Sequence, residues 1–176
     1  MNDEIEFTQA DLSHLSNLVA LVNSAYRGDS SKAGWTTEAD FLDGQRIDAE
    51  MLKELIEKPE SVVLICQDAE TDKILGCVHL EKHNNSCHLG MLTVDPNTQG
   101  QGLGSELLKE AEAFAQFWDC DGIKIHVITL RQELIAWYER HGFKATGELV
   151  AFPYGQEKYG IPKRPDLQLQ VMLKRI

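Results

Sequence analysis

The sequence predicts a mixed α+β fold, and three features indicate it: composition, hydrophobic periodicity and the order of the periodic segments. Of the 176 residues, 43% are hydrophobic and 26% are charged, which is typical of a packed globular protein and not of a disordered one. We therefore expect a single domain over residues 1–176. A first strand and the helical segments after it are followed by three strands, a helix, a strand, a helix and two strands.

The first segments predict a short strand and a helix. Residues 5–8 alternate in polarity as a half-buried strand does, and Asp11 suits the N-cap of the helix that follows. This helix ends near Gly28. The apolar residues that recur along it at helical spacing are Leu12, Leu15, Leu18, Val19 and Val22.

Two more helical segments are predicted before the sheet. Residues 34–38 have the composition of a loop, and we expect this loop to run into a helix that ends at Asp43. A further helix is expected to start at Asp48, with apolar residues on one face. Pro59 ends it, because proline cannot donate the backbone hydrogen bond that a helix interior needs.

Three consecutive strands follow in the prediction. Residues 61–66 form a compact apolar run, a polar turn covers residues 68–72, and strands are expected over residues 74–83 and 86–94. Asn84 and Asn85 between the last two strands suit a two-residue hairpin, because asparagine tolerates positive φ angles. This hairpin fixes which residues oppose each other across the pair.

The second half of the chain alternates between helices and strands. The helix after the third of these strands carries an apolar stripe, and the next helix is followed by Gly142 in the C′ position. The predicted elements are a helix over residues 105–118, a strand over 123–130, a helix over 133–140, and strands over 144–152 and 167–173 on either side of a loop over 153–166.

The charge balance excludes several classes of partner. The chain has 17 basic and 28 acidic residues, a formal net charge of −11. Nucleic acids and anionic membranes both require a basic surface, so we expect neither as a partner. No apolar run approaches the ~20 residues of a membrane-spanning helix, and the acidic N-terminus does not resemble a secretory signal. A cytoplasmic protein is expected.

The cysteines do not form a recognisable framework. They are scattered through apolar runs without a C-x-x-C pair, which predicts buried thiols and argues against disulfides or a zinc site. These residues are Cys66, Cys77, Cys87 and Cys120.

A glycine-rich turn lies between a predicted strand and a predicted helix. Gly100, Gly102 and Gly104 fall within five residues, and glycine lets the backbone turn tightly and lets a ligand approach it. The free N–H groups at the start of the following helix can bind an anion such as a phosphate. Neither the Walker A pattern nor the dinucleotide-binding pattern fits, and on the glycines alone a turn without any ligand remains an alternative.

The residues around this turn resemble the acetyl-CoA signature of the GNAT superfamily of N-acetyltransferases. In the segment over residues 90–104, Gln99, Gly102 and Gly104 match the family's Q/R-x-x-G-x-G/A pattern, and residues 138–143 (YERHGF) match its Y-E-x-x-G-F motif. The resemblance extends to the element order over residues 4–174. It implies a central, mostly antiparallel sheet of six to seven strands, splayed between strands 4 and 5 and flanked by about four helices.

The resemblance also implies which residues hold acetyl-CoA. The pyrophosphate is expected on the first turn of the helix and the pantetheine arm beside the preceding strand, where a backbone N–H near Leu92 polarises the thioester carbonyl. The family often has asparagine where this chain has Arg131, so this contact is open, and a solvent-facing charge is the alternative. The implied cofactor-binding residues are Leu92, Thr93, Val94, Gln99, Gly100, Gln101, Gly102, Leu103, Gly104, Ser105 and Arg131.

Three residues are candidates for catalysis. Tyr138 matches the family's acid, which protonates the departing CoA thiolate, although a core aromatic residue is the alternative. The hairpin sets Glu81 opposite His88, and this pair could relay a proton from the acceptor amine, with a surface ion pair as the alternative. A metal site is not expected, because His79 and His83 lie ~13 Å apart along a strand and Cys87 faces away from His88.

The acceptor side is expected, from the resemblance, between residues 26–57 and 153–166. Trp35 and the tyrosines of the second segment could bound an organic acceptor, with ordinary loop packing as the alternative. Asp40 and Asp43 are expected to share a helix face that could attract a cationic amine, with solvated helix acids as the alternative. Residues 1–60 carry 13 acidic and 5 basic residues against 15 and 12 in residues 61–176, which favours a cationic acceptor.

These observations predict an N-acetyltransferase that moves the acetyl group of acetyl-CoA to a small primary amine by direct attack in a ternary complex. No cysteine holds a position that suggests a covalent acyl-enzyme. Two alternatives stay open: a protein or peptide N-acetyltransferase of the same fold, and a non-catalytic acyl-CoA-binding module. The sequence leaves the acceptor, the acyl length and the oligomeric state open, a homodimer included.

Overall fold

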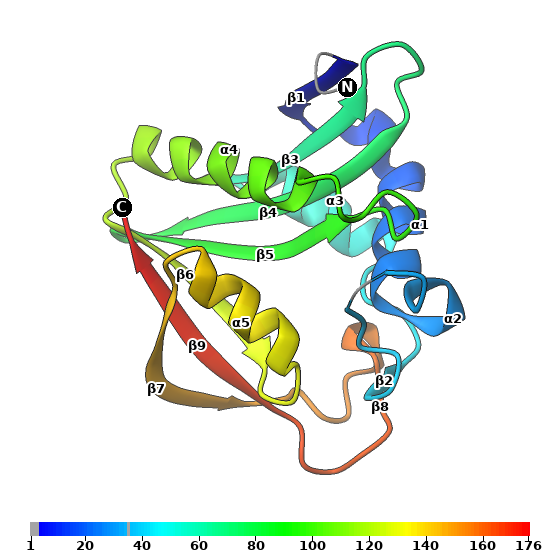
Figure 1. The fold of residues 1–176 in the computed structure, drawn as a ribbon, viewed down its shortest axis with the longest axis vertical. Helices are drawn as coiled ribbons and strands as arrows, with labels where there is room; N and C mark the ends of the chain where they lie inside the picture. The colour runs from blue at the N-terminus through cyan, green and yellow to red at the C-terminus, as the bar shows by residue number, and fades with distance from the viewer. Residues whose placement is uncertain (1–3, 35) are drawn as a thin grey trace.

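A computed structural model describes residues 4–34 and 36–176. Seven strands form the main sheet in the order β1-β3-β4-β5-β6-β9-β7 (Figure 1). Their bounds are β1 Ile5–Gln9, β3 Ser61–Asp68, β4 Ile74–His83, β5 Ser86–Val94, β6 Gly122–Ile128, β7 Lys144–Ala151 and β9 Gln168–Arg175. A second, two-stranded sheet pairs β2 (Leu42–Asp43) with β8 (Ile161–Pro162). All pairs of the main sheet are antiparallel except β5 with β6.

Five α-helices and two short 3-10 helices complete the described chain. The α-helices are α1 Leu15–Tyr26, α2 Gly28–Ser31, α3 Ala49–Glu57, α4 Leu103–Phe117 and α5 Gln132–Arg140, and the 3-10 helices are η2 Leu12–His14 and η3 Glu157–Tyr159. The predicted mixed α+β fold with a mostly antiparallel sheet is confirmed.

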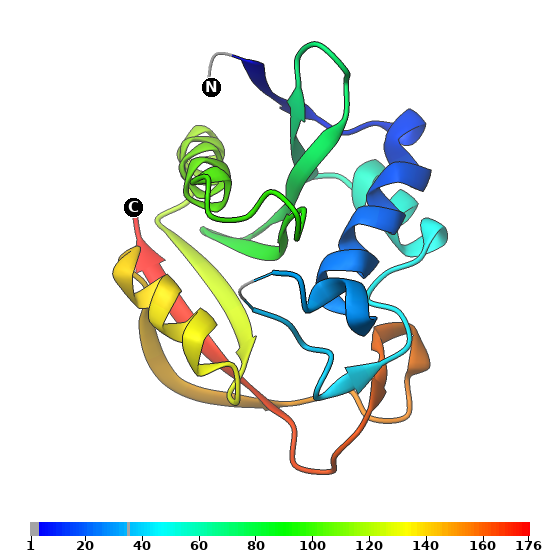
Figure 2. The same cartoon turned by 45° about the vertical axis from the view of Figure 1, so that its right-hand side comes forward.

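The helices cover the sheet on both faces (Figures 1 and 2). Helix α4 packs against β3, β4 and β5 on one face, where Leu107, Leu108 and Ala111 are buried. Helices α1 and α3 pack on the other face, where Leu18 and Leu52 are fully buried. Burial of these apolar stripes supplies the main stabilisation of the fold.

The hairpin between β4 and β5 forms with the predicted register. Asn84 has a φ of 56°, a left-handed conformation that asparagine tolerates better than most residues. His83 pairs with Ser86, and Glu81 pairs with His88 across the strands. The expected cross-strand positions of Glu81 and His88 are therefore confirmed.

The sheet opens between β5 and β6. These parallel strands pair only between residues 86–88 and 122–124, and the rest of β5 has no strand partner on that side. The β5 strand also carries a bulge: its register with β4 shifts between Cys77 and His79, and Met91 opposite has a φ of 56°. A bulge bends a strand and increases its twist. The expected splay between the fourth and fifth strands along the chain is thus confirmed (Figure 2).

One predicted helix does not form. The segment ending at Asp43 makes a single turn, in which the Glu38 carbonyl accepts from the N–H groups of Phe41 and Leu42, and then enters β2. Leu42 is buried with Ile128, Phe152 and Leu167. Tertiary contacts therefore override the local helical pattern here.

The other predicted elements differ from the structure mainly at their ends. Asp11 caps η2 and not α1 directly, and Asp48 caps α3 through a bond from the Met51 N–H to its carboxylate. Helix α4 begins two residues earlier than expected, at Leu103. Gly142, with a φ of 94°, follows α5 as expected, and the Phe143 N–H bonds to the Tyr138 carbonyl at 3.0 Å.

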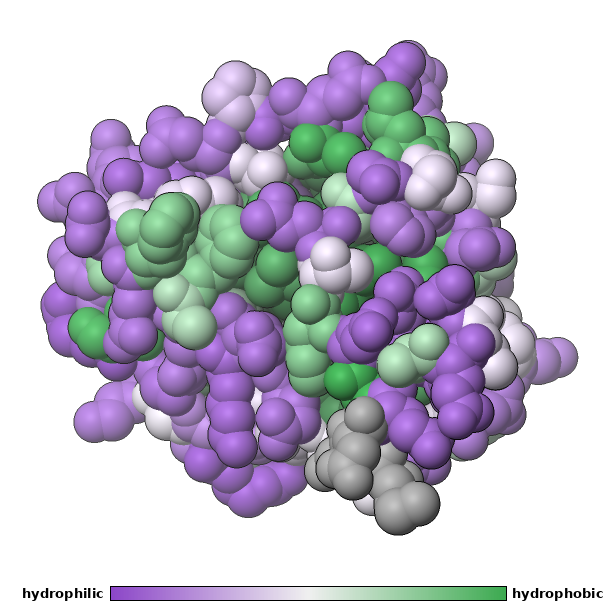
Figure 3. Space-filling view, turned by 90° about the horizontal axis from the view of Figure 1, so that it is seen from above, coloured by the Kyte–Doolittle hydropathy of each residue, from purple (hydrophilic) through white to green (hydrophobic). Residues whose placement is uncertain are grey.

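The face seen in Figure 3 is mostly hydrophilic, with apolar residues showing in patches between the polar ones. All four cysteines are buried free thiols. In residues 4–34 and 36–176, no helix is long and apolar enough to span a membrane.

Candidate active site

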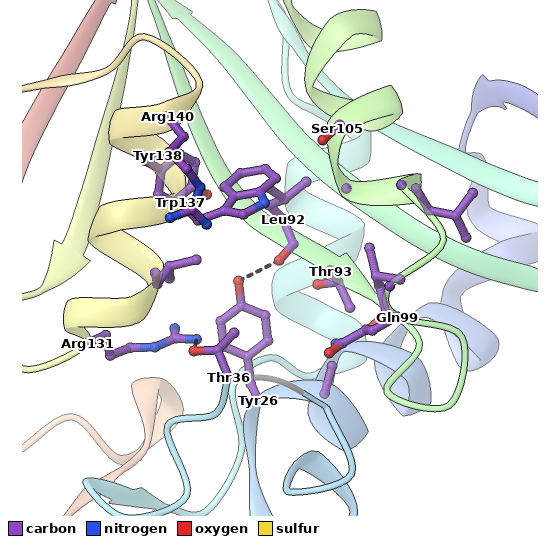
Figure 4. A pocket seen from close by; sticks show the side chains of 17 residues that line it. Tyr26, Thr36, Leu92, Thr93, Gln99, Ser105, Arg131, Trp137, Tyr138 and Arg140 are labelled. Atoms are coloured by element: carbon purple, nitrogen blue, oxygen red, sulfur yellow. Dashed lines mark hydrogen bonds between the residues drawn. The ribbon is translucent and has the colours of Figure 1, made fainter.

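A cavity of about 300 Å³ opens where α4 begins, between β5 and α5 (Figure 4). All but one of the residues that the sequence assigned to cofactor binding line it, and Gln101 is the exception. The predicted residues in the lining are Leu92, Thr93, Val94, Gln99, Gly100, Gly102, Leu103, Gly104, Ser105 and Arg131. Tyr138 lines the cavity too.

The N-terminus of α4 offers this cavity a set of backbone donors. Gly100 and Gly102 have φ angles of 87° and 80°, conformations that strain a residue with a side chain. Gly102 is the N-cap, and no side chain caps the helix. The first N–H groups of α4, with the positive end of the helix dipole, are therefore available to an anion. The exposed Arg140 adds a positive charge to the same lining.

Helix α5 is fixed against the start of α4 by a chain of side-chain contacts. The Ser105 hydroxyl and the Nε2 atom of His141 are 2.9 Å apart, and His141 Nδ1 lies 2.8 Å from the Trp137 carbonyl. The His141 ring stacks on Trp137 at 4.0 Å between centroids. A side chain at Gly104 would meet Trp137 at 3.4 Å. These contacts set the width of the cavity between the two helices.

Tyr26 connects α1 to the bulged part of β5. Its hydroxyl donates to the Leu92 carbonyl at 2.9 Å (Figure 4). Burial raises the pKa of Tyr26, so its hydroxyl remains a donor at neutral pH. This bond fixes the free edge of β5 at the position where the resemblance places the thioester.

Tyr138 is buried, with only 5% of its surface exposed, and lies against Trp137 and Phe143 in edge-to-face contacts. Among the residues that the structure describes, no hydrogen-bond partner is found for its hydroxyl. Burial raises the pKa of Tyr138 well above its ordinary value, so the phenol keeps its proton at neutral pH. The hydroxyl can therefore donate to a bound molecule.

A second cavity of about 330 Å³ adjoins the first. It lies on the far side of the opening between β5 and β6, and includes Gly90, His126 and Tyr159 in its lining. Five residues belong to the linings of both cavities: Tyr26, Leu92, Arg131, Leu134 and Tyr138. The two cavities therefore meet at Leu92 and Tyr138, so molecules bound in each would be adjacent there.

Arg131 is neither free for a ligand nor exposed to solvent. Its Nη1 atom lies 2.8 Å from Glu38 Oε2, and its Nη2 atom donates to Thr36 at 3.0 Å. The other Glu38 oxygen accepts from Arg27 Nη1 at 2.5 Å. All three charged groups are buried. Burial alone would raise the pKa of Glu38, but Arg131, Arg27 and Arg46 together hold it below its ordinary value.

Glu81 and His88 do not line either cavity. The Glu81 carboxylate contacts His83 and forms an ion pair with Lys58 at 3.2 Å. The His88 ring stacks on His83 at 4.2 Å and lies 6.2 Å from the ring of His126. Glu81 thus pairs with His83 and not with its cross-strand neighbour. His126, which the sequence argument did not select, is the member of this group that lines the second cavity.

Both segments expected at the acceptor side contribute to the second cavity, but the expected acids do not. Tyr26, Arg46 and Tyr159 line it. Asp40 is an exposed partner of Lys32, and Asp43 pairs with Lys163. Because no helix forms there, these acids do not share a helix face. Trp35 lies outside the described residues.

The lining residues that sequence reasoning missed are Arg27, Glu38 and His126, together with the exposed Arg140. Arg27 and Glu38 are 11 residues apart in the sequence, and Arg131 lies 93 residues after Glu38. No local sequence pattern indicates that these three residues form a cluster. His126 offered one usable signal: it and Lys124 are the polar residues of β6, whose other side chains are apolar. Arg140 lies within the YERHGF motif, on the same helix as Tyr138.

The chain is similar to known proteins in sequence and in fold. Residues 21–143, more than half of the chain, match the family model described as "Acetyltransferase (GNAT) family". The chain is 26% identical over 89 residues to the uncharacterized protein YdhI of Bacillus subtilis (strain 168), covering 51% of this chain and 52% of that protein. It therefore spans about half the length of this curated relative.

Solved structures share the fold at low identity. The chain is similar to the ribosomal-protein-S18-alanine N-acetyltransferase of Escherichia coli, with a TM-score of 0.70, 14% identity, and coverage of 98% of this chain and 94% of that one. A Bacillus anthracis chain solved in complex with acetyl coenzyme A gives a TM-score of 0.58 at 22% identity, covering 70% of this chain and 66% of that one.

Proposed function

Because the chain belongs to the GNAT family of acetyltransferases, we propose that it transfers the acetyl group of acetyl-CoA to an amine where its two cavities meet. Acetyl-CoA is the acyl donor, which the family and the acetyl-CoA complex of a structural neighbour support. The observation that carries the proposal is the shared wall of the two cavities, with Leu92 and Tyr138 in both linings.

The residues of the first cavity suit the parts of the donor. The uncapped N-terminus of α4 and Arg140 would hold its phosphates. The free edge of β5, opened by the splay, would pair with its pantetheine amides. A backbone N–H near Leu92 would stabilise the negative charge that develops on the acetyl carbonyl oxygen, as an oxyanion hole does. Arg131 serves this site by anchoring Glu38 and Thr36.

The proposed reaction forms one bond and breaks one bond. The amine nitrogen attacks the acetyl carbon directly, and the C–S bond then breaks. The Tyr138 hydroxyl donates its proton to the departing sulfur and regains a proton from solvent when the products leave. A covalent acyl-enzyme is not needed, and the cysteines do not favour one, because burial raises the pKa of Cys66, Cys77 and Cys87 to about 12.

The proton that leaves the amine requires a base. We assign it to His126, which lines the second cavity and whose pKa burial lowers, so that the imidazole is neutral at pH 7. His126 is exposed, so it can pass the proton on to solvent. In this proposal the predicted pair, Glu81 and His88, lies behind the base and outside both cavities; the ring of His88 contacts that of His126 without a hydrogen bond between them.

Variants of the two histidines test this assignment. His126→Gln should lower kcat by about 10²-fold at neutral pH, a typical contribution of a general base. It should also remove the fall in kcat/KM at acidic pH, because the base works only while neutral. His88→Gln should have a smaller effect. If His126→Gln retains the wild-type rate and pH profile, the base is another group.

Binding of the donor is tested by thermal unfolding. Acetyl-CoA at a hundred times its dissociation constant should raise Tm by about 5–10 °C, because it binds only the folded state. Gly102→Ala should reduce this shift, since its new side chain strains the cavity backbone. Gly155→Ala is the matched control: both glycines have φ angles near 80° and open space around them, but only Gly102 lines the cavity.

A rate measurement separates catalysis from mere binding. Release of free CoA thiol should depend on an added amine. An acetyl-CoA-induced rise in Tm without any amine-dependent thiol release would instead indicate the acyl-CoA-binding module. A strong preference for peptides over small amines would indicate the protein or peptide N-acetyltransferase.

A further inference from the structure

The second cavity carries an excess of positive charge. Arg27, Arg46 and Arg131 line it, and Glu38 is the one acidic residue found in the described lining. This is the reverse of the charge that the acidic N-terminal segment led us to expect. The acids of that segment, Asp40 and Asp43, form their ion pairs away from the cavity.

Both carboxylate oxygens of Glu38 already form ion pairs with two of the three arginines. One carboxylate oxygen accepts from Arg27 and the other from Arg131. The Nε atoms of both arginines are buried and have no hydrogen-bond partner within residues 4–34 and 36–176. A second carboxylate, Glu133, reaches Arg131 only through the Thr36 hydroxyl. One carboxylate thus faces two buried guanidinium groups, and buried polar atoms normally find partners.

Arg46 is the third cation: its charge helps to lower the pKa of Glu38, but it forms no ion pair within 4.0 Å with an acidic residue in the part of the chain that the structure describes. Its guanidinium carbon lies 5.3 Å above the centre of the Tyr26 ring, and that of Arg131 lies 5.8 Å from the same ring. The Tyr26 ring is part of the wall that both cavities share. The guanidinium of Arg46 is therefore beside the position where the acetyl group would be transferred.

We propose that the acceptor carries an anionic group next to its amine, and that Arg46 binds this group in the field of Arg27 and Arg131. The inference rests on the proposed acetyl transfer and specifies its substrate class. Guanidinium groups bind carboxylates through paired, charge-assisted hydrogen bonds. An anion bound to Arg46 would be separated from Leu92 only by the ring of Tyr26. The amine of a small acceptor would therefore lie near the wall that the two cavities share.

The rest of the lining favours a free amino acid with an apolar side chain. Leu42, Ile128, Phe152 and Leu169 line the same cavity, and Leu42, Ile128 and Phe152 are buried together. An α-amino acid offers the three features that the cavity recognises: an amine, an anion on the adjacent carbon and an apolar side chain. A polyamine would instead bring further positive charge beside three arginines.

Matched acceptors test the proposal on the unmodified protein. The rate of CoA thiol release is measured with free L-leucine, L-methionine and L-phenylalanine, and with the amide of each. The amide keeps the amine and the side chain but lacks the anionic group. We expect kcat/KM to be at least ~10-fold higher for the acid than for its amide, the effect of one charge-assisted contact. Equal rates, or amides and spermidine as better acceptors, would overturn the proposal.

Arg46→Gln then assigns the effect to this residue. It should raise KM for the amino acid while leaving KM for the amide and for acetyl-CoA unchanged. Arg175→Gln is the control, since Arg175 is exposed at the end of β9 and lines neither cavity. A raised KM for acetyl-CoA alone would place Arg46 on the donor, against the proposal. The Tm of the variant verifies that it is folded.

Different results would contradict the proposed function and the proposed anionic acceptor. If the protein acetylates amides or polyamines as well as amino acids, the proposed function holds and the anionic acceptor is wrong. If acetyl-CoA binds but no amine of either kind is acetylated, the proposed function is itself wrong, and with it this inference.

Discussion

Tyr138→Phe is expected to lower kcat by about 10²-fold or more, the contribution of a well-placed general acid, while leaving the affinity for acetyl-CoA unchanged. The substitution removes one oxygen and keeps the ring in its contacts with Trp137 and Phe143. The hydroxyl has no partner among the described residues, so its loss breaks no hydrogen bond between them.

The raised pKa of Tyr138 is compatible with this role. Burial disfavours the phenolate, and the same burial disfavours a thiolate, as the raised pKa of the buried Cys87 illustrates. A departing CoA sulfur in the same surroundings is therefore a strong base. Because the pKa is raised, deprotonation of Tyr138 should not limit the rate on the alkaline side of the profile.

Tyr154→Phe is the control for the loss of a tyrosine hydroxyl. Tyr154 accepts from the Leu167 N–H at 2.7 Å and lines neither cavity. It should leave kcat unchanged even if it costs some stability. Single-turnover kinetics and acetyl-CoA titration give the two quantities to compare. An unchanged kcat in Tyr138→Phe would leave Tyr138 as a core aromatic residue without an acid role.

Glu38→Gln is expected to have the largest effect on stability, a loss of about 3–5 kcal/mol in the free energy of unfolding. The amide cannot neutralise Arg27 and Arg131, and its NH2 group would face a guanidinium donor. Both arginines are almost fully buried, so water cannot take the place of the carboxylate. Urea unfolding measures the loss, provided that the transition is two-state.

Glu106→Gln removes the same charge at an exposed position and serves as the control. Glu106 pairs with Lys109 on the surface of α4 at 3.6 Å, and such pairs contribute about 0–1 kcal/mol. If the two variants lose equal stability, the ion pairs of Glu38 do not hold together the end of α1 at Arg27, the loop that carries Glu38 and the start of α5 at Arg131.

The pH dependence of this cluster has a defined sign. The pKa of Glu38 is lowered in the folded protein, so its contribution is present at neutral pH. That contribution is lost as the pH falls below the ordinary range of a glutamate and through the lowered pKa. Glu38→Gln should accordingly flatten the acid side of the stability profile.

Much of the fold was predictable because its determinants are local. The Asn84–Asn85 turn sets the β4–β5 register, and with it the opposition of Glu81 and His88. Proline, the Asp48 cap and Gly142 end or start helices through bonds within a few residues. The glycine turn and the YERHGF motif likewise lie within short segments, and they identified most of the first cavity.

The parts that escaped prediction depend on residues distant in sequence. Strand β2 forms because it pairs with β8, more than 100 residues later in the chain. The local sequence that ends at Asp43 has a helical pattern and does not indicate this pairing. From the sequence, Arg131 is either a ligand contact or a surface charge, because nothing in the sequence places Glu38 beside it. In the structure the two residues form an ion pair. The sequence shows that the N-terminal segment is rich in acidic residues, but it does not show which side chains face the cavity. Only the folded chain shows that arginines line it.

The central claim is that the two cavities bring an acetyl donor and an amine together. The most direct test follows acetyl-CoA labelled in its acetyl group, with L-leucine as acceptor, and measures both products by mass spectrometry. The account predicts one labelled acetyl group on the amine nitrogen for each CoA thiol released. CoA release without an acetylated product, across amino acids, amides and peptides alike, would contradict it.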